Sequence, residues 1–303
     1  MRIATLLPSA TEIVCALGLE DSLVGVSHSC AYPEAAKKLP AMTSTHVPYE
    51  RDSQTIDAYV REHLGSHEAL YDLHIDRLKA ARPDVIISQA LCDVCAVASG
   101  DVLDAVQGLP GSPELIDLTP KTLEDVFDDI ERVGYRLGHG ARARAIVAQL
   151  RERRQRVADR TEGLDPEERP RVVFLEWLLP PFNGGHWNPE LVNIAGGIDL
   201  IGARGEPSST QDWPSILALA PDLVFVACCG FDIPRAMQDV QALAETAEWK
   251  TLLAGASRGA FVTDGHAYFA SPGPRLIDGL EIMAKAFHPD LFGEPSPDRC
   301  LRL

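Results

Sequence analysis

The sequence contains no run of about 18 to 20 apolar residues, the length that a helix needs to cross a bilayer. The opening residues, MRIATLLPS, have neither the length nor the cleavage site of a secretory leader. These two absences predict a protein that is not inserted in a membrane and that, as encoded, stays in the cytoplasm.

Basic residues are outnumbered by acidic ones. The chain has 28 Lys and Arg against 44 Asp and Glu, which gives a formal net charge of −16 and a pI near 4.9. A chain of this charge is repelled by phosphate backbones and anionic lipids, so neither nucleic acid nor an anionic membrane surface is expected as the main partner. A neutral or cationic ligand is favoured.

Two phosphate-binding motifs are also missing. Neither G-x-G-x-x-G nor G-x-x-x-x-G-K-[ST] occurs at a predicted strand-to-helix turn, which argues against nucleotide chemistry. The seven cysteines are an odd number scattered along the chain, and this fits free thiols in a reducing compartment better than a disulfide framework.

Short apolar runs bounded by turn residues are present throughout and predict strands. These runs cover residues 3–7, 23–27, 84–88, 172–176, 222–227 and 259–263. Helical patterns alternate with them, which predicts βα units and mainly parallel sheets. A chain of 303 residues exceeds the size of a typical single core, so two lobes are expected.

The stretch LLPSATEIVCALGL, residues 6–19, predicts a strand end, a tight turn and a short helix. Ser9 and Glu12 fit an S-x-x-E capping box, which makes Ser9 a helix cap rather than a nucleophile. Gly18 fits the C′ position that closes a helix. The N-terminus of this helix is therefore predicted to face the strand end.

The second half of the chain repeats this arrangement. After a strand and a longer loop, Asn188 is predicted as the N-cap, Pro189 as the first helical residue and Gly196 as the helix end. The segments IDRLKAARPDVIIS and WPSILALAPDLVFV are also alike, because each reads as a helix, a Pro-Asp pair and a buried strand. This internal similarity indicates two related lobes.

Residues 119–159 lie between the two halves and show helical periodicity. Thr119 and Pro120 fit a helix start, and the early acids and late arginines both complement a helix dipole. The pattern predicts one helix over most of residues 120–158, about 55 to 60 Å long at ~1.5 Å per residue. The alternative is two ordinary helices joined near Gly138.

In an open parallel sheet the ligand lies beyond the carboxyl ends of the strands, so the residues that follow each predicted strand are site candidates. They are Pro8, Ser9, His28, Cys30, Tyr32, Gln89, Cys92, Cys95, Trp177, Phe182, His186, Trp187, Cys228, Cys229 and Phe231. The aromatic members fit either core packing or the wall of a site for a planar ligand.

The thiols in this set raise two further hypotheses. A transition-metal or redox site would use Cys92, Cys95 and Cys229, with His28, Cys30 or His186 as additional donors. Alternatively, Cys30 and His28 could form a nucleophilic pair, although a two-residue spacing gives this no geometric support. Small buried thiols without any function explain the same pattern.

Taken together, these segments resemble the cobalamin-binding members of the helical-backbone (class III) substrate-binding proteins that serve ABC transporters. The similar segments are PSATEIVCALGLEDSLVGVSHSCAYP, RPDVIIS, APDLVFV, RVVFLEWLLPPFNGGHWNPELVNIAGG and YFASPGPRLIDGLEIMAKAF, in the family's order over nearly the whole chain. The resemblance implies an α/β fold of two Rossmann-like lobes with mainly parallel sheets, joined by one long backbone helix. The implied domains are an N-terminal lobe (1–118), a connecting helix (119–160) and a C-terminal lobe (161–303).

The resemblance also implies a vitamin-transport function without catalysis. A cobalamin-like corrinoid or related metal chelate would be clamped non-covalently in the cleft between the lobes. Carried over by motif position, the cleft residues are Pro8, Ser9, Tyr32, Phe182, Tyr268, Phe269 and Arg275. The implied partner is an ABC-transporter permease whose arginines meet one surface acid per lobe: Asp76 in the first lobe, and in the second Asp212, because Pro214 occupies the matching position.

The sequence is therefore interpreted as a binding protein rather than an enzyme. Members of the family that bind transported ligands carry a leader, which makes an extracytoplasmic location the alternative to the cytoplasm. The alternative function is a cytoplasmic metal- or thiol-dependent enzyme or redox protein that uses a Cys/His-rich cleft.

Overall fold

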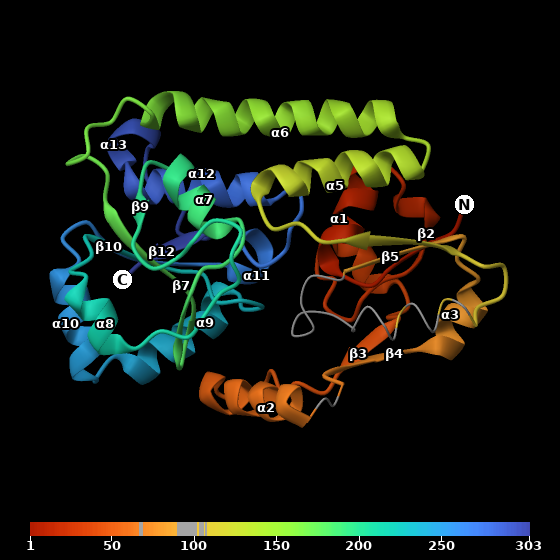
Figure 1. Ribbon diagram of the computed structural model, residues 1–303, viewed down its shortest axis with the longest axis horizontal. Helices are drawn as coiled ribbons and strands as arrows, with labels where there is room; N and C mark the ends of the chain where they lie inside the picture. Colours follow the sequence, from red (N-terminus) through yellow and green to blue (C-terminus); the bar gives the residue numbers. More distant parts are fainter. Residues whose placement is uncertain (67–68, 90–101, 103–105, 107) are drawn as a thin grey trace. The chain divides into compact units, whose positions relative to one another are not determined.

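The computed structural model describes residues 1–66, 69–89, 102, 106 and 108–303 (Figure 1). The chain divides into two compact units. Unit 1 comprises residues 1–120 and 124–147, and unit 2 comprises residues 121–123 and 148–303. Within the described residues, no helix is long and apolar enough to span a membrane.

Unit 1 is built on a parallel sheet with the strand order β2-β1-β5-β6. The strands are β1 (Ile3–Thr5), β2 (Leu23–Gly25), β5 (Val85–Gln89) and β6 (Glu114–Leu118). An antiparallel pair, β3 (Thr43–Thr45) and β4 (Tyr71–Leu73), forms a separate small sheet. The helices are α1 (Pro8–Ala16), η1 (Glu20–Ser22), η2 (Glu34–Lys38), α2 (Ser53–Ser66) and α3 (Ile75–Ala81), followed by α5 (Leu123–Arg136).

Unit 2 is built on a mixed sheet with the order β12-β11-β10-β7-β8, in which β9 also pairs with β7. The strands are β7 (Arg171–Leu178), β8 (Pro181–Asn183), β9 (Ile198–Asp199), β10 (Leu223–Val226), β11 (Gly259–Thr263) and β12 (Cys300–Arg302). The helices are α7 (Asn188–Ile194), α8 (Trp213–Ala218), α9 (Ile233–Leu243), α10 (Ala247–Gly255), α11 (Gly265–Tyr268), α12 (Leu276–Phe287) and α13 (Pro289–Phe292). The central strands β7, β10 and β11 are parallel, and β8 and β12 add antiparallel edges.

All six predicted strands are present, as β1, β2, β5, β7, β10 and β11. The two predicted helix ends are also confirmed. At Gly18 and Gly196 the backbone is left-handed, with φ 73° and 87°, and the amide N–H of each glycine donates to the carbonyl three residues earlier, at 2.9 and 3.1 Å. Glycine adopts this conformation without a steric penalty, which explains both helix ends.

The amino end of β1 in unit 1 is held by a three-bond bracket. The Asp84 N–H donates to the Arg2 carbonyl at 2.8 Å, and the Arg2 N–H donates back to Asp84 Oδ2 at 2.7 Å. The Arg2 guanidinium then donates from Nε to the Ala81 carbonyl at 2.7 Å, at the end of α3. The bracket joins the helix, the Pro-Asp turn and the first strand.

Unit 2 contains the same bracket. The Asp222 N–H donates to the Arg171 carbonyl at 2.9 Å, and the Arg171 N–H donates to Asp222 Oδ2 at 2.9 Å. The Arg171 guanidinium donates from Nη2 to the Leu219 carbonyl at 2.6 Å. The repeat seen in the sequence is therefore a repeat of structure.

The prediction of one helix over residues 120–158 is wrong. The segment contains α5 and then α6 (Gly140–Thr161), which lie side by side in Figure 1. Gly138 ends α5 with φ 76°: its N–H donates to the Tyr135 carbonyl at 3.1 Å, and the His139 N–H donates to the Gly134 carbonyl at 2.7 Å. A Cβ on Gly134 would lie 2.2 Å from the Ala143 Cβ, so the absent side chain allows the two helices to approach.

The long helix of the predicted fold class is α6 alone. It has 22 residues, which corresponds to about 33 Å at ~1.5 Å per residue. Its residues up to Val147 belong to unit 1, and those from Ala148 onward belong to unit 2. The predicted fold class, two α/β lobes with mainly parallel sheets and a long connecting helix, is confirmed.

Candidate functional site

The carboxyl edge of the unit 1 sheet begins where β1 runs directly into α1. The N-cap is Leu7, with extended φ and ψ and no side-chain cap, and Pro8 occupies the first turn. The predicted capping box is therefore wrong, because Ser9 already lies inside the helix. Ser9 is 1% exposed, and its Oγ has no hydrogen-bond partner in the described part of the chain.

A chain of side-chain hydrogen bonds joins α1 to the loop after β2. The hydroxyls of Thr5 and Thr11 are 2.7 Å apart, and Thr11 Oγ1 lies 3.0 Å from Cys30 Sγ. Burial raises the pKa of the Cys30 thiol to about 11, and burial together with Glu20 raises the pKa of Cys15 to about 11. Both thiols are protonated at neutral pH, and a thiol is a poor nucleophile and metal ligand compared with a thiolate.

His28 lies just beyond β2 and is held by β3. Its backbone N–H and its ring Nδ1 contact Thr43 Oγ1 at 3.1 and 2.8 Å. Its ring lies 5.7 Å from that of Tyr71 on β4, and the Tyr71 hydroxyl is 3.1 Å from the Tyr49 hydroxyl. Burial, and then His74, lower the pKa of His28, so its imidazole is neutral at neutral pH.

The other candidates in unit 1 differ in accessibility. Tyr32 is 50% exposed, whereas Gln89 is buried at the end of β5. Cys92 and Cys95 lie outside the described residues. Among the residues that are described, no group of three or more His, Cys, Asp or Glu side chains could hold a metal ion.

The carboxyl edge of unit 2 differs because the antiparallel strand β8 is inserted between β7 and α7. Phe182 is in β8 and is half-buried, while His186 and Trp187 lie in the loop that follows. His186 has a left-handed backbone with φ 54°, fixed by its N–H bond to the Glu206 carbonyl (2.6 Å) and by the Gly205 N–H bond to its own carbonyl (2.8 Å). Such strain persists only where the surroundings hold it, and it clusters at functional sites.

One sequence prediction in this loop needs correction. The N-cap of α7 is Trp187 rather than Asn188, and it makes no side-chain cap. Trp187 is 5% exposed, and its Nε1 donates to the Phe269 carbonyl at 2.9 Å. Phe269 is 1% exposed and its ring lies 5.7 Å from that of Phe174. Phe269 is thus packed in the core of unit 2, and its place in the ligand site stays a prediction.

Two aromatic rings and a guanidinium lie close together near the end of β7. The Trp177 ring lies 4.9 Å from the Phe231 ring and is tilted by 37° to it. The Arg235 guanidinium lies 4.0 Å from the centroid of the Phe231 ring. Arg235 is in turn ion-paired with the buried Asp239 at 3.1 Å. Phe231 is therefore held by contacts with both residues and is buried, whereas Trp177 is half-buried.

The last candidates in unit 2 follow β11. The half-buried ring of Tyr268 has two cations nearby, the guanidiniums of Arg275 at 5.9 Å and of Arg299 at 5.7 Å. Cys229 follows β10 and is partly buried, and its N–H donates to the Glu176 carbonyl at 2.8 Å. Its neighbour Cys228 is fully buried, and burial raises the pKa of that thiol.

Sequence reasoning missed Glu176, which it counted only as a strand end. Gly185 donates its N–H to Glu176 Oε2 at 3.0 Å. Burial raises the pKa of this carboxyl against the opposing effect of hydrogen bonds from Ser208, Gly185 and Asn188. An acid at the end of an otherwise apolar strand was the available signal, because charged residues are rarely buried without a partner.

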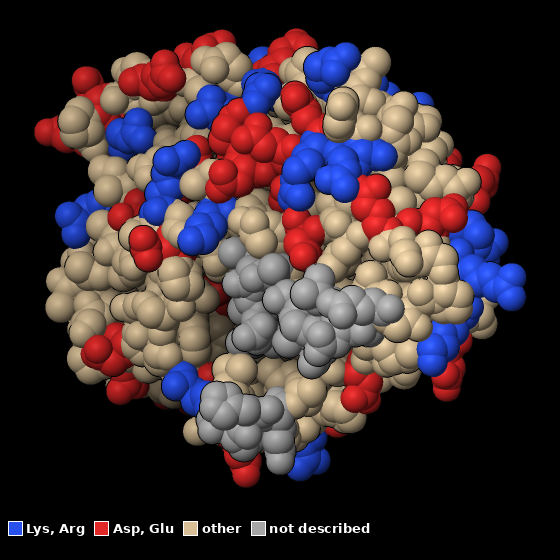
Figure 2. Space-filling view, turned by 45° about the vertical axis from the view of Figure 1, so that its right-hand side comes forward, with Lys and Arg blue, Asp and Glu red and all other residues tan. Residues whose placement is uncertain are grey.

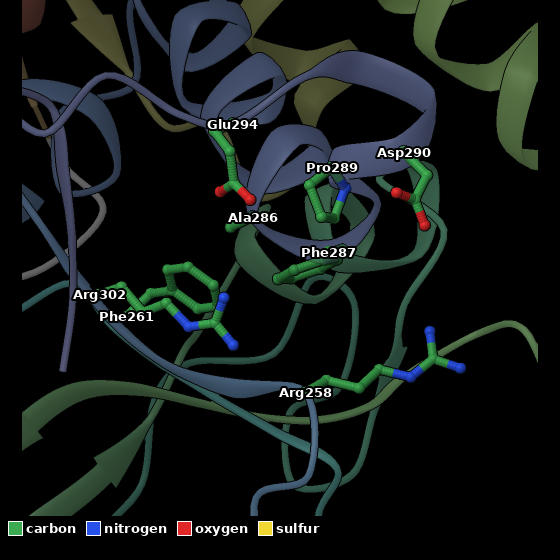
Figure 3. Close-up of a pocket in the computed structure, with 8 residues that line it drawn as sticks. All are labelled: Arg258, Phe261, Ala286, Phe287, Pro289, Asp290, Glu294 and Arg302. Atoms are coloured by element: carbon green, nitrogen blue, oxygen red, sulfur yellow. The ribbon is translucent and has the colours of Figure 1, made fainter.

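A pocket of about 220 Å³ lies elsewhere on unit 2, beside the amino end of β11 (Figure 3). Arg258 and Arg302 approach it from one side and Asp290 and Glu294 from the other, over an apolar floor that includes Phe287. None of the predicted site residues lines it. The candidate residues instead gather at the carboxyl edge of each sheet, where open parallel sheets bind ligands.

Two α/β units with polar and aromatic side chains at their carboxyl edges define a ligand-binding class of protein. Residues 3–267 match the family described as "Periplasmic binding protein". The chain belongs to this family, whose members are solute-binding transport components and not enzymes.

Individual relatives are distant. The chain is 22% identical over 298 residues to an uncharacterized ABC transporter substrate-binding lipoprotein of Bacillus subtilis (strain 168), YvrC, covering 97% of this chain and 82% of that protein. It is 25% identical over 232 residues to the vitamin B12-binding protein of Yersinia pestis (strain Pestoides F), covering 75% and 69%. A periplasmic heme-binding protein from Pseudomonas aeruginosa has a similar fold, with a TM-score of 0.70, 23% identity and coverage of 96% and 93%.

Proposed function

We propose that this chain binds a cobalamin-like corrinoid for an ABC transporter and that the carboxyl edges of its sheets supply the ligand-binding residues. The observation that supports this proposal most is the chemistry of the unit 1 edge. Residues 6–12 and 26–33, which follow β1 and β2, include five hydroxyl side chains, one imidazole and no Lys or Arg, and the hydroxyl side chains of Ser29 and Tyr32 are not buried. Corrinoids carry neutral amide side chains, which hydroxyls and backbone amides can hydrogen-bond.

The carboxyl edge of unit 2 supplies aromatic side chains. Phe182, Tyr268 and Trp177 supply apolar surface for a macrocycle. The apolar faces of a macrocycle are costly to hydrate, so contact with these rings favours binding. Arg275 and Arg299 beside Tyr268 favour a second candidate, an iron porphyrin, because guanidiniums pair with propionate carboxylates.

Calorimetric titration of the purified chain with cyanocobalamin, aquacobinamide and haemin tests this proposal. We expect saturable heat with the two corrinoids and weaker binding of haemin. If haemin alone binds, the proposed ligand is an iron porphyrin and not a corrinoid. An absence of heat with all three would refute macrocycle binding altogether.

The thiol-dependent alternative has little support. Burial raises the pKa of Cys300 to about 12, in line with the high thiol pKa values in both units. Thiol labelling of the native chain tests the remaining thiols: we expect Cys92, Cys95 or Cys229 to react and corrinoid to slow that reaction. Unchanged labelling at saturating corrinoid would place these thiols outside the site.

For the transporter partner we propose Asp76 and Asp212 as contacts. Asp76 is exposed in the first turn of α3, and Asp212 is exposed at the N-cap of α8, the matching helix of unit 2. On the face shown in Figure 2, Lys and Arg side chains gather in separate groups with acidic side chains between them, which supports a protein partner over nucleic acid.

The family's description favours the extracytoplasmic location over the cytoplasmic one, and we propose it for this chain. Fractionation of the native host's cells, followed by antibody detection of the chain, would test this location. Detection in the cytosolic fraction alone would contradict it.

A further inference from the structure

The hydrogen bonds around His28 show which ring nitrogen carries the proton. The other ring nitrogen is left with an unshared lone pair. Thr43 Oγ1 has one proton and two lone pairs. It donates its proton to Ser27 Oγ at 3.3 Å, so both of its lone pairs accept from His28, one from the backbone N–H and one from Nδ1. Nδ1 therefore carries the ring proton, and Nε2 is unprotonated.

The rest of the network is consistent with this direction. Ser27 Oγ accepts from the Thr43 hydroxyl and from the Ser29 N–H at 3.3 Å, which fills its two lone pairs. Its own proton then goes to Ser29 Oγ at 3.0 Å. The contacts of His28 within the described residues involve its backbone N–H, Nδ1 and ring face, so Nε2 is the part of the ring left to meet a ligand.

A neutral imidazole with one nitrogen fixed by a hydroxyl is the arrangement by which proteins present the other nitrogen to a metal. The described residues offer no cluster of three or more side chains that could hold a bare metal ion. A metal that is already held by a chelate needs only one further donor from the protein. A single oriented histidine fits that second case.

We propose that His28 Nε2 coordinates the metal of the bound macrocycle in an axial position. This inference rests on the proposed function, because it needs a metal held by four in-plane nitrogens with an exchangeable axial ligand. The step is a ligand exchange: the Nε2 lone pair forms a bond to the metal as a water molecule leaves. No electron is transferred, and the Nδ1 proton remains in its bond to Thr43.

The test compares two corrinoids on the wild type and His28→Ala. Aquacobinamide has labile water at its axial cobalt positions, whereas in cyanocobalamin both positions are occupied. We expect the wild-type chain to shift the visible bands of aquacobinamide and His28→Ala to lose that shift and bind at least about tenfold more weakly. Cyanocobalamin cannot exchange an axial ligand for His28, so His28→Ala should weaken its binding less than it weakens the binding of aquacobinamide. Free imidazole should restore the shift to the His28→Ala complex.

Two further variants separate coordination from structure. Thr43→Val removes the fixed acceptor and should weaken aquacobinamide binding about tenfold, the size expected for a residue that orients a metal ligand. His46→Ala removes an exposed histidine of the same unit that is paired with Asp72 at 2.9 Å, and it should behave like the wild type.

Each remaining outcome decides the matter. If wild type and His28→Ala give the same aquacobinamide spectrum while cyanocobalamin binds, the axial role is wrong and the proposed function stands. If no macrocycle binds, the axial role of His28 and the proposed function are both wrong. If only haemin binds and its visible spectrum depends on His28, the axial role stands and the corrinoid is replaced by an iron porphyrin.

Discussion

The two units have the same amino edge and different carboxyl edges. Arg2 with Asp84 in unit 1, and Arg171 with Asp222 in unit 2, form the same three-bond bracket between helix, turn and strand. At the other end, unit 1 presents hydroxyls and His28, whereas unit 2 presents aromatic rings from β7, the inserted strand β8 and α11. One edge supports the fold, and the other is free to vary with the ligand.

The largest effect that would test this contrast is expected for Phe269→Ala. Phe269 lies in the core of unit 2 against Phe174 and Phe225, so its truncation should cost about 3 to 5 kcal/mol of unfolding free energy. Denaturant unfolding measures the loss. Tyr32→Ala, at an exposed position of unit 1, is the control and should change stability by less than about 0.5 kcal/mol. A stable Phe269→Ala protein with weakened ligand binding would return Phe269 to the site.

Ring truncation at the carboxyl edges should act on binding instead. Tyr32→Ala, Phe182→Ala and Tyr268→Ala each remove contact area and should cost about 1 to 3 kcal/mol of binding free energy, roughly ten- to a hundredfold in Kd. Calorimetry with cyanocobalamin and thermal unfolding should be run on all three. A variant that unfolds more easily yet binds like the parent belongs to the core, which is the competing interpretation for Phe182.

Equal effects are expected from the two brackets. Asp84→Ala and Asp222→Ala each remove the side-chain acceptor of an arginine N–H and should cost about 1 kcal/mol. Denaturant midpoints of the two variants would show whether the costs agree to within about 0.5 kcal/mol. A large cost in one unit only would mean that the shared geometry does not have a shared role.

The smallest effect concerns the matching helices α3 and α8. Asp212 Oδ1 accepts from the Ser215 N–H at 2.9 Å and caps α8, whereas α3 has no side-chain cap. Asp212→Ala should therefore cost about 1 kcal/mol, and Asp212→Asn, which keeps a capping oxygen, about nothing. Asp76→Ala should also leave the thermal midpoint unchanged. A destabilised Asp212→Asn protein would show that the charge, not the cap, stabilises the helix.

Strand positions were predictable from sequence because short apolar runs between turn residues have few alternatives. Helix continuity was not. The acids of α5 and the arginines of α6 satisfy the dipole trend of one long helix as well as that of two, so only the left-handed φ of Gly138 decides the matter. The predicted capping role of Ser9 failed because the helix begins at Pro8, with Leu7 as its N-cap, two residues before the predicted cap.

The candidate site was predictable only in outline. Its location followed from the direction of the strands. Strand direction predicts which loops lie at the carboxyl edge, but it does not predict how their side chains are oriented. The partners of His28 come from β3 and β4, two three-residue strands too short to give a sequence pattern. Glu176 was overlooked because its hydrogen-bond partner Gly185 comes from a turn that no local pattern connects to it.

The contact between Trp177 and Phe231 affects which tryptophan can report on ligand binding. Of the four tryptophans, Trp213 and Trp249 lie against each other on α8 and α10, with ring centroids 5.9 Å apart, and Trp187 is buried. Trp177 is half-buried at the carboxyl edge and lies 4.9 Å from the Phe231 ring, which also contacts Arg235. We therefore expect a ligand that binds at that edge to change the intrinsic fluorescence without any label, and we expect Trp177→Phe to remove this change.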